Sequence, residues 1–338
     1  MKEQLWVPAP PKERREPAPE QSSAARPART TGARSTGRAA GLLAALVVGL
    51  GLLALCLVAA VVVPAFLSPG DGGRTNVLLL GIDRRNGTGW AYRTDTILVV
   101  TVDPASRAAG ILSIPRDLQV PIPGHGEDRI NTANFWGAQG DDPEAGPALL
   151  RATIEGNFGI PIDGYLLVDF NAFVQIVDAL GGVDVDVPKT LHDTRYPNPK
   201  PEDPYGTKTV HFDPGMQHMD GTQAIEYARS RMSTSDFDRA KRQQQILLAL
   251  RRKALSPRGI VRLPALARVV LGGVKTNLRL GSLARLALLA ARIDPAHLQQ
   301  VVLEHPLVST YSRADGAAVL LPNWDLINPV IDELFGPR

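Results

Sequence analysis

Three short apolar runs stand close together and dominate the pattern of hydrophobic and polar positions. They cover residues 77–82, 97–102 and 110–114, and each is rich in Val, Ile and Leu and has the length of a β-strand. Asp103-Pro104 marks a tight connection between the second and third runs. We therefore expect three strands in an antiparallel meander.

Charged residues lie where these strands begin or end, on one edge of such a meander. They are Asp83, Arg93, Asp95, Arg116 and Asp117. Carboxylates and guanidinium groups that converge in this way suit a divalent cation beside a phosphate. The same residues also fit solvated charges that close ordinary strands, so the pattern alone leaves both interpretations open.

Helical and strand patterns alternate through the rest of the chain. Helical periodicity covers residues 147–158, 171–180, 221–229, 239–255, 283–293 and 324–335, and strand patterns cover 165–170, 183–187, 299–303 and 318–321. Residues 189–214 are polar and rich in Pro, which predicts a long loop. Interleaved strands and helices predict an α/β fold with a mixed central β-sheet packed by helices.

A second group of cations surrounds the start of the helix predicted at residues 239–255. Arg239, Arg242 and Gln243 fall at positions i, i+3 and i+4 and therefore share one helical face. Cations at a helix N-terminus oppose the helix dipole, whereas an anion there would be held by the arginines and by helix N–H groups. A solvated basic face is the alternative, and the proximity of Arg229 and Arg231 weakens it.

The first part of the chain has a different composition. Residues 1–38 are rich in Pro, Ala, Arg, Ser and Glu, which predicts a disordered tail. Residues 39–67 carry no charge and are long enough to cross a bilayer, which predicts a retained transmembrane helix, followed by a linker at residues 68–75. Arginines before the anchor place the tail in the cytoplasm and the domain at residues 76–338 outside.

Charge and cysteine content exclude some classes of protein. The formal net charge is only +3, and the basic tail has no helix-turn-helix pattern, so we expect no nucleic acid partner. The single cysteine, Cys56, lies in the apolar stretch, so the chain can form no internal disulfide.

A series of motifs resembles the LytR–CpsA–Psr family. The first half carries NVLLLGID, YRTDTILVVTVDP, ILSIPRDLQVPIPG and DRIN, and the second half carries IPIDGYLLVDFNAFVQIVDALGGVDVDVP and MDGTQAIEYARSRMSTSDFDRAKRQQQIL. They cover residues 76–255 in order, with no missing block. The resemblance implies an α/β sandwich whose sheet shelters a long apolar pocket, in a single-pass bacterial membrane protein of the cell envelope.

The resemblance also implies an activity. Members of the family transfer a glycopolymer from a polyprenyl-pyrophosphate carrier to a peptidoglycan sugar hydroxyl, and a phosphodiester link forms. Teichoic acids, capsular polysaccharides and arabinogalactan are typical polymers. Two other functions fit the same residues: a hydrolase that acts on polyprenyl-pyrophosphate lipids with water as acceptor, and a non-enzymatic lipid-binding regulator of the envelope.

Individual residues receive roles from the same resemblance. Asp83 and Asp95 would hold Mg²⁺ or Mn²⁺ and would form the catalytic group together with Arg93 and Arg116. The pyrophosphate would be bound by Arg93, Arg116, Arg129, Arg229, Arg231, Arg239 and Gln243. These groups would be oriented by Asp117, Asn131, Asp236 and Arg242.

Two positions depart from the usual family pattern. Arg129 stands where Lys is usual, and a planar bidentate guanidinium is not equivalent to the point charge of an ammonium. Asp238 stands where Gly is usual, and a carboxylate there would weaken anion binding if it pointed toward the arginines. From the helical pattern alone, Asp236 is placed to cap this helix.

Overall fold

The computed structural model describes residues 73–84, 91–198, 203, 205–231 and 235–337. The tail predicted at residues 1–38, the anchor predicted at 39–67 and most of the linker at 68–75 lie outside these residues. Of the helices within the described ranges, none is long and apolar enough to cross a membrane.

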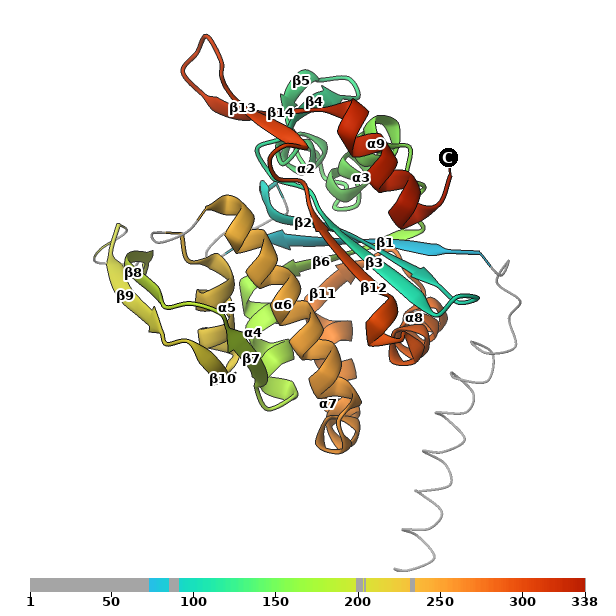
Figure 1. Ribbon diagram of the computed structural model, residues 1–338, viewed down its shortest axis with the longest axis vertical. Coiled ribbons are helices and arrows are strands. Elements are labelled where there is room, and N and C mark those ends of the chain that lie inside the picture. Colours follow the sequence, from blue (N-terminus) through green and yellow to red (C-terminus); the bar gives the residue numbers. More distant parts are fainter. Residues whose placement is uncertain (1–72, 85–90, 199–202, 204, 232–234, 338) are drawn as a thin grey trace, which may run out of the picture. The chain divides into compact units, whose positions relative to one another are not determined.

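A six-stranded mixed sheet runs through the domain in the order β11-β6-β1-β2-β3-β12 (Figure 1). Its strands are β1 (Thr75–Ile82), β2 (Thr94–Asp103), β3 (Ala108–Ser113), β6 (Gly164–Asp169), β11 (Val274–Thr276) and β12 (Leu298–Val302). The first three pair antiparallel in sequence order, so the predicted meander is confirmed. β6 and β12 pair parallel with β1 and β3, and β11 pairs antiparallel with β6.

Helices α3 (Ala145–Phe158) and α9 (Trp324–Phe335) close one face of this sheet (Figure 1). Alternation along β1 sends Leu78, Leu80 and Ile82 into this layer, where each is almost fully buried. The two helices contribute Leu150, Ile154, Phe158, Ile327 and Ile331 to the same core. A short helix α2 and two small ladders, β4–β5 and β13–β14, complete this layer: α2 (Thr132–Gly137), β4 (Gln119–Ile122), β5 (Gly126–Arg129), β13 (Val308–Ser312) and β14 (Ala318–Pro322).

The opposite face carries a second layer with a core of its own. Its helices are α4 (Phe170–Ala179), α5 (Gly221–Arg229) and α6 (Asp236–Leu255), and they lie on the other side of the sheet from α3 and α9 (Figure 1). They pack with the ladder formed by β7 (Val183–Val187) and β10 (Gly215–Met219). α7 (Pro257–Gly273) and α8 (Leu280–Arg292) follow at the border of this layer.

The segment at residues 189–214 is not the long loop that its composition predicted. It contains β8 (Leu191–Pro197) and β9 (Thr207–Phe212), which pair antiparallel as a hairpin. The buried positions of the hairpin carry Leu191, Tyr196, Val210 and Phe212. Polar outward residues and several prolines masked this alternation, and packing against the second core stabilises the strands.

Candidate functional site

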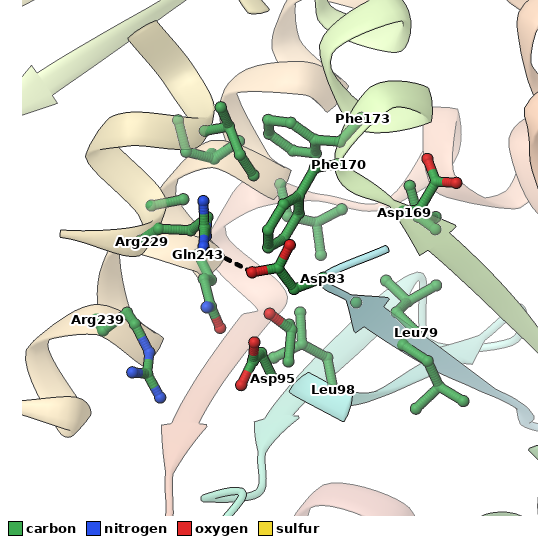
Figure 2. Close-up of a pocket in the computed structure, with 18 of the residues that line it drawn as sticks. Leu79, Asp83, Asp95, Leu98, Asp169, Phe170, Phe173, Arg229, Arg239 and Gln243 are labelled. Atoms are coloured by element: carbon green, nitrogen blue, oxygen red, sulfur yellow. Dashed lines mark hydrogen bonds and ion pairs between the residues drawn. The ribbon is translucent and has the colours of Figure 1, made fainter. Parts of the chain in front are cut away.

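A cavity of about 890 Å³ lies between the sheet and helices α4, α5 and α6. Much of its wall is apolar and includes Leu79, Leu98, Leu166, Phe173, Leu247 and Leu250. Charged side chains gather at one end, where Asp83 and Asp95 face Arg229, Arg239 and Gln243 (Figure 2). A cavity with one charged and one apolar end suits an amphiphilic ligand.

A β-bulge between β1 and β2 positions the two aspartates. Gly81 pairs with Thr96 and Ile82 pairs with Thr94, so Asp95 is the extra residue. A Cβ atom at Gly81 would lie 2.9 Å from the Cβ atom of Thr96, which explains why glycine is needed at this close approach. Asp83 follows β1 directly, and both carboxylates line the charged end of the cavity.

Arg229, the last residue of α5, is held on three sides. Its Nη2 atom lies 3.1 Å from Oδ2 of Asp83, and its Nη1 atom donates to the hydroxyl of Tyr196 at 3.1 Å. The guanidinium also lies over the ring of Phe170, 3.9 Å from the centroid. These contacts join Arg229 to three distant parts of the sequence and fix the guanidinium before any ligand binds.

Arg116 lies between two carboxylates. Its Nη1 atom donates to Oδ1 of Asp95 at 2.6 Å, and its Nε atom lies 3.4 Å from Oδ2 of Asp117. Burial alone would lower the pKa of Arg116, but Asp117 and Asp95 outweigh it and raise the pKa above its usual value. Asp117 also lies 3.4 Å from Nε of Arg129, so it orients both cations.

The N-cap of α6 is Ser235, so the expectation that Asp236 caps this helix was wrong. The Ser235 hydroxyl accepts from the N–H of Asp238, and the Asp238 carboxylate accepts from the N–H of Ser235. This reciprocal capping box gives a hydrogen-bond acceptor to the N–H groups of both Ser235 and Asp238. A single aspartate cap at position 236 would not satisfy both donors. Asp236 instead accepts from Nη1 of Arg239 at 2.8 Å and orients that side chain.

Among the cations that line the described cavity, Arg239 is the most deeply buried, with 6% of its surface exposed. Burial lowers its pKa to about 10, and the neighbouring charges of Arg231 and Arg116 act in the same direction, against the opposing effect of Asp236. The guanidinium is therefore charged at neutral pH in surroundings that disfavour the charge. An anion bound here would relieve this cost.

The two departures from the family pattern have separate structural roles. Asp238 is engaged by the capping box and lies 3.7 Å from Nζ of Lys189, and it is absent from the described cavity lining. Its carboxylate is turned toward Ser235 and Lys189 and not into the described cavity, which is not the orientation that the expected weakening of anion binding requires. Arg129 donates from Nη2 to the carbonyl oxygen of Ala318 at 2.7 Å and supports Asp117 from outside the described lining.

Other predicted residues take supporting or peripheral positions. Gln243 lines the cavity one helical turn after Arg239. Asn131 is buried, and its N–H donates to the carbonyl oxygen of Arg116 at 3.2 Å. Arg93 is exposed and, like Arg129, does not belong to the cavity lining that the structure describes.

Arg242 positions the segment that carries two of the arginines. It is buried, and its Nε atom donates to the carbonyl oxygen of Tyr227 at 2.8 Å. Its Nη2 atom donates to the carbonyl oxygen of Ser230. Arg242 therefore holds the backbone on either side of Arg229 through two carbonyl oxygens, and its orienting role stays a prediction.

Comparison with known proteins identifies the relationship. The LytR_cpsA_psr family profile matches residues 63–330. The chain belongs to the LytR–CpsA–Psr family. It is 33% identical over 210 residues to the polyisoprenyl-teichoic acid–peptidoglycan teichoic acid transferase TagV of Bacillus subtilis, a match that covers 61% of this chain and 50% of TagV. The resemblance inferred from the motifs is thereby confirmed.

Two further curated relatives carry different names. The regulatory protein MsrR of Staphylococcus aureus is 33% identical over 211 residues, which cover 62% of this chain and 58% of MsrR. The polyisoprenyl-teichoic acid–peptidoglycan teichoic acid transferase TagU of Oceanobacillus iheyensis is 34% identical over 213 residues, which cover 62% of this chain and 61% of TagU. The matches thus span about half to three fifths of the length of these relatives.

Solved structures of relatives have the same fold. The crystal structure of B. subtilis TagV superposes with a TM-score of 0.63 at 26% identity and covers 79% of this chain and 99% of that one. TagT bound to LI-WTA superposes with a TM-score of 0.61 at 27% identity and covers 79% of this chain and 92% of that one. The predicted α/β fold with a mixed central sheet is therefore confirmed.

Sequence reasoning missed an acid that organises this LytR–CpsA–Psr site. Asp193, on β8, is 2% exposed and lines the cavity. Its Oδ2 atom accepts from the hydroxyl of Ser230 at 2.8 Å and from the N–H of Arg231 at 3.1 Å. The available signal was the spacing of Leu191, Asp193 and Tyr196, because an acid on the inward side of a strand needs buried partners.

The carboxylate pair at the charged end fits a magnesium ion. The described residues contain no group of three or more His, Cys, Asp or Glu side chains placed to hold a metal. Mg²⁺ is commonly bound by one or two carboxylates, with substrate phosphates and water as its other ligands. Asp83, directly after β1, and Asp95, on the neighbouring strand β2, are two such carboxylates at one cavity, and Mn²⁺ accepts the same oxygen ligands.

Proposed function

We propose that this protein transfers a glycopolymer from a polyprenyl-pyrophosphate carrier to a sugar hydroxyl of peptidoglycan. The observation that carries the proposal is the division of one cavity into an apolar wall and an end that bears Arg116, Arg229, Arg231 and Arg239. A polyprenyl pyrophosphate has the same division, because its long hydrocarbon chain ends in an anionic head. The names of TagV and TagU as transferases support the same activity.

The arginines would act on the pyrophosphate. The oxygen of the acceptor hydroxyl would attack the phosphorus next to the glycan and would lose its proton to a nearby carboxylate or to water. The bond between this phosphorus and the bridging oxygen would break, and polyprenyl phosphate would leave with the new charge. Guanidinium groups that are already in position stabilise such charge without reorganisation. Arg229 and Arg116 are held in this way by Asp83 and Asp95, and Arg239 is held by Asp236.

Asp83 and Asp95 would hold Mg²⁺, which when bound would neutralise phosphate charge. We expect the paired change of Asp83→Asn and Asp95→Asn to abolish magnesium-dependent transfer while the protein stays folded. The rise in melting temperature on addition of Mg²⁺ should also disappear in this variant. Full magnesium-dependent activity in the double variant would rule out this pair as ligands.

We further propose that residues 39–67 anchor the protein in the cell membrane, with the domain outside the cytoplasm. The test introduces a cysteine at Thr207, a position exposed at the start of β9, and treats intact cells with a membrane-impermeant thiol reagent. Labelling of intact cells is expected. Labelling that requires lysis would show the opposite orientation.

Product analysis separates the transferase from the two other functions. The purified full-length protein is incubated with a polyprenyl-pyrophosphate-linked glycan, with and without acceptor peptidoglycan. We expect acceptor-dependent release of polyprenyl phosphate and glycan bound to the acceptor. Equal release without acceptor would indicate a hydrolase. Lipid binding without cleavage would indicate a lipid-binding regulator.

A further inference from the structure

Helices α7 and α8 expose an unusual number of apolar side chains. Val261 is 81% exposed, and Ile260, Leu271 and Leu280 are each more than half exposed. α8 consists mostly of Leu and Ala, yet none of its residues is buried. Soluble proteins seldom expose so many large apolar side chains on two successive helices, so these helices are suited to a partner.

The charges around these apolar residues all have one sign. From residue 251 to residue 293 every charged side chain is Arg or Lys. Arg258, Arg268 and Arg279 are exposed beside the apolar positions of α7 and α8. A second copy of the chain would bring the same positive charge against this surface, which disfavours self-association through it. An anionic partner is favoured instead.

α8 lies toward the apolar end of the candidate site. Along β2, Asp95 stands at the charged end and Leu98 lines the cavity wall. Farther along the same face of this strand, Val100 packs near Leu289 and Ala290 of α8. The direction from the charged end to the apolar end of the cavity therefore leads toward α8.

α7 adjoins the same end from the helical side. It packs against α4 and α6, whose Phe173 and Leu250 belong to the cavity wall. Its course follows α4, because Arg262 lies against Gly181 just beyond the end of α4 and Gly273 lies against Ala172 near its beginning. The exposed apolar residues of α7 are thus on the outside of the layer that encloses the cavity.

We propose that the surface formed by α7 and α8 docks on a bilayer that contains anionic phospholipid. The exposed Leu, Ile and Val side chains would enter the boundary between headgroups and acyl chains, and the arginines would pair with lipid phosphates. A bilayer offers both the apolar and the anionic partner that this surface lacks. Docking would place the apolar end of the cavity beside the lipid, so a lipid chain could enter with little exposure to water.

The functional benefit of this docking rests on the lipid-linked donor proposed above. The docking itself is tested without measuring glycan transfer. The full-length protein, with Cys56→Ser as background, is reconstituted into vesicles with or without phosphatidylglycerol. An environment-sensitive fluorophore is attached to Val261→Cys or, as a matched control, to Met216→Cys on β10. Met216 is 69% exposed and lies outside α7 and α8.

In vesicles with phosphatidylglycerol, the fluorophore at position 261 should shift its emission to the blue and should be quenched by nitroxide-labelled lipids. The fluorophore at position 216 should show neither effect. Adding Arg258→Gln and Arg268→Gln should weaken the quenching at position 261 several-fold. These outcomes would support the docking surface even if the transfer assay failed.

Equal quenching at positions 261 and 216, or none at 261, would overturn the proposal. A blue shift at 261 that depends on protein concentration in detergent, without lipid, would identify self-association and would also overturn it. Loss of glycan transfer with unchanged quenching would count against the proposed function alone. The two inferences can therefore fail separately.

Discussion

The two faces of the central sheet use the same strands for different purposes. On the face covered by α3 and α9, Leu78 is fully buried, whereas on the other face Leu79, the next residue of β1, lines a cavity. The covering layers differ. α4, α5 and α6 share a core with β7 and the β8–β9 hairpin, so this layer is stabilised without filling the face of the sheet. A layer with its own core can leave a binding cavity beneath it.

The largest effect that we expect is a loss of glycan transfer when an arginine at the charged end of the cavity is replaced. Arg231→Ala should lower glycan transfer roughly ten- to a thousandfold, because it removes one of the guanidinium charges at the end of the cavity where negative charge would develop. Arg151→Ala, on α3 of the closed layer, is the matched control, since its ion pair with Glu155 lies on the surface. Steady-state transfer rates and melting temperatures of both variants would be measured. Equal activities would remove the support for an arginine site.

Adjacent residues on β1 allow the two faces to be compared directly. Leu78→Ala should lower the free energy of unfolding by about 2–5 kcal/mol, because it leaves a void in a close-packed core. Leu79→Ala should cost less than about 1 kcal/mol, since its side chain is already half-buried against a cavity, but it should weaken lipid binding. Urea unfolding and lipid titration would measure both. Similar unfolding costs would mean that the cavity face is packed like the closed face.

A substitution at Asp238 should change the stability of the cavity layer without changing ligand binding in the cavity. Although burial alone raises its pKa, hydrogen bonds from Ser235 and the charge of Lys189 bring the pKa below its usual value. Asp238→Ala should cost about 1 kcal/mol, the usual scale of a helix cap, with transfer nearly unchanged.

The pH dependence of this variant has a definite sign. The folded-state pKa of Asp238 is lower than its pKa in the unfolded chain, which is about 3.9. The carboxylate therefore adds to the free energy of unfolding above that pH, and this addition is lost as the pH falls through the folded-state pKa. Parent and variant should therefore converge in acid during urea unfolding. A difference that persists at low pH would contradict the role of the carboxylate charge.

The smallest expected effect concerns the empty site. The lowered pKa of Arg239 means that the charged form is disfavoured by the fold and that this cost is present at every pH below about 10. Arg239→Gln should leave the melting temperature unchanged or raise it by roughly 2–4 °C, and it should reduce the stabilisation by added inorganic pyrophosphate. A lower melting temperature with an unchanged response to pyrophosphate would assign Arg239 a structural role only.

The strands and the charged edge could be predicted because they depend on local pattern. Short runs of Val, Ile and Leu predicted β1, β2 and β3, and the meander brought Asp83, Asp95, Arg116 and Asp117 to one edge. Arg93 was assigned to the same edge, but its exposure depends on the path of the chain before β2, and the pattern of β2 carries no information about that path.

The β8–β9 hairpin could not be predicted, because its strands are stabilised by contacts far away in the sequence. The buried position of Asp193 is explained only by its hydrogen bonds to Ser230 and to the backbone of Arg231, almost forty positions later. Tyr196 likewise depends on Arg229. Proline and polar outward residues predicted a loop here, and tertiary packing overrode that local preference.

The sequence by itself determined the strand pattern, the family and the residues able to bind a phosphate, because alternation, helical spacing and motif order are local properties. Only the tertiary structure decided that an apolar wall from β1, β2, β6, α4 and α6 ends at the arginines of α5 and α6. It also decided that α7 packs against α4 and α6 and that α8 lies farther along the cavity face of β2, near Val100. Which faces meet depends on strand register and on packing between distant segments, and periodicity along the chain does not specify either.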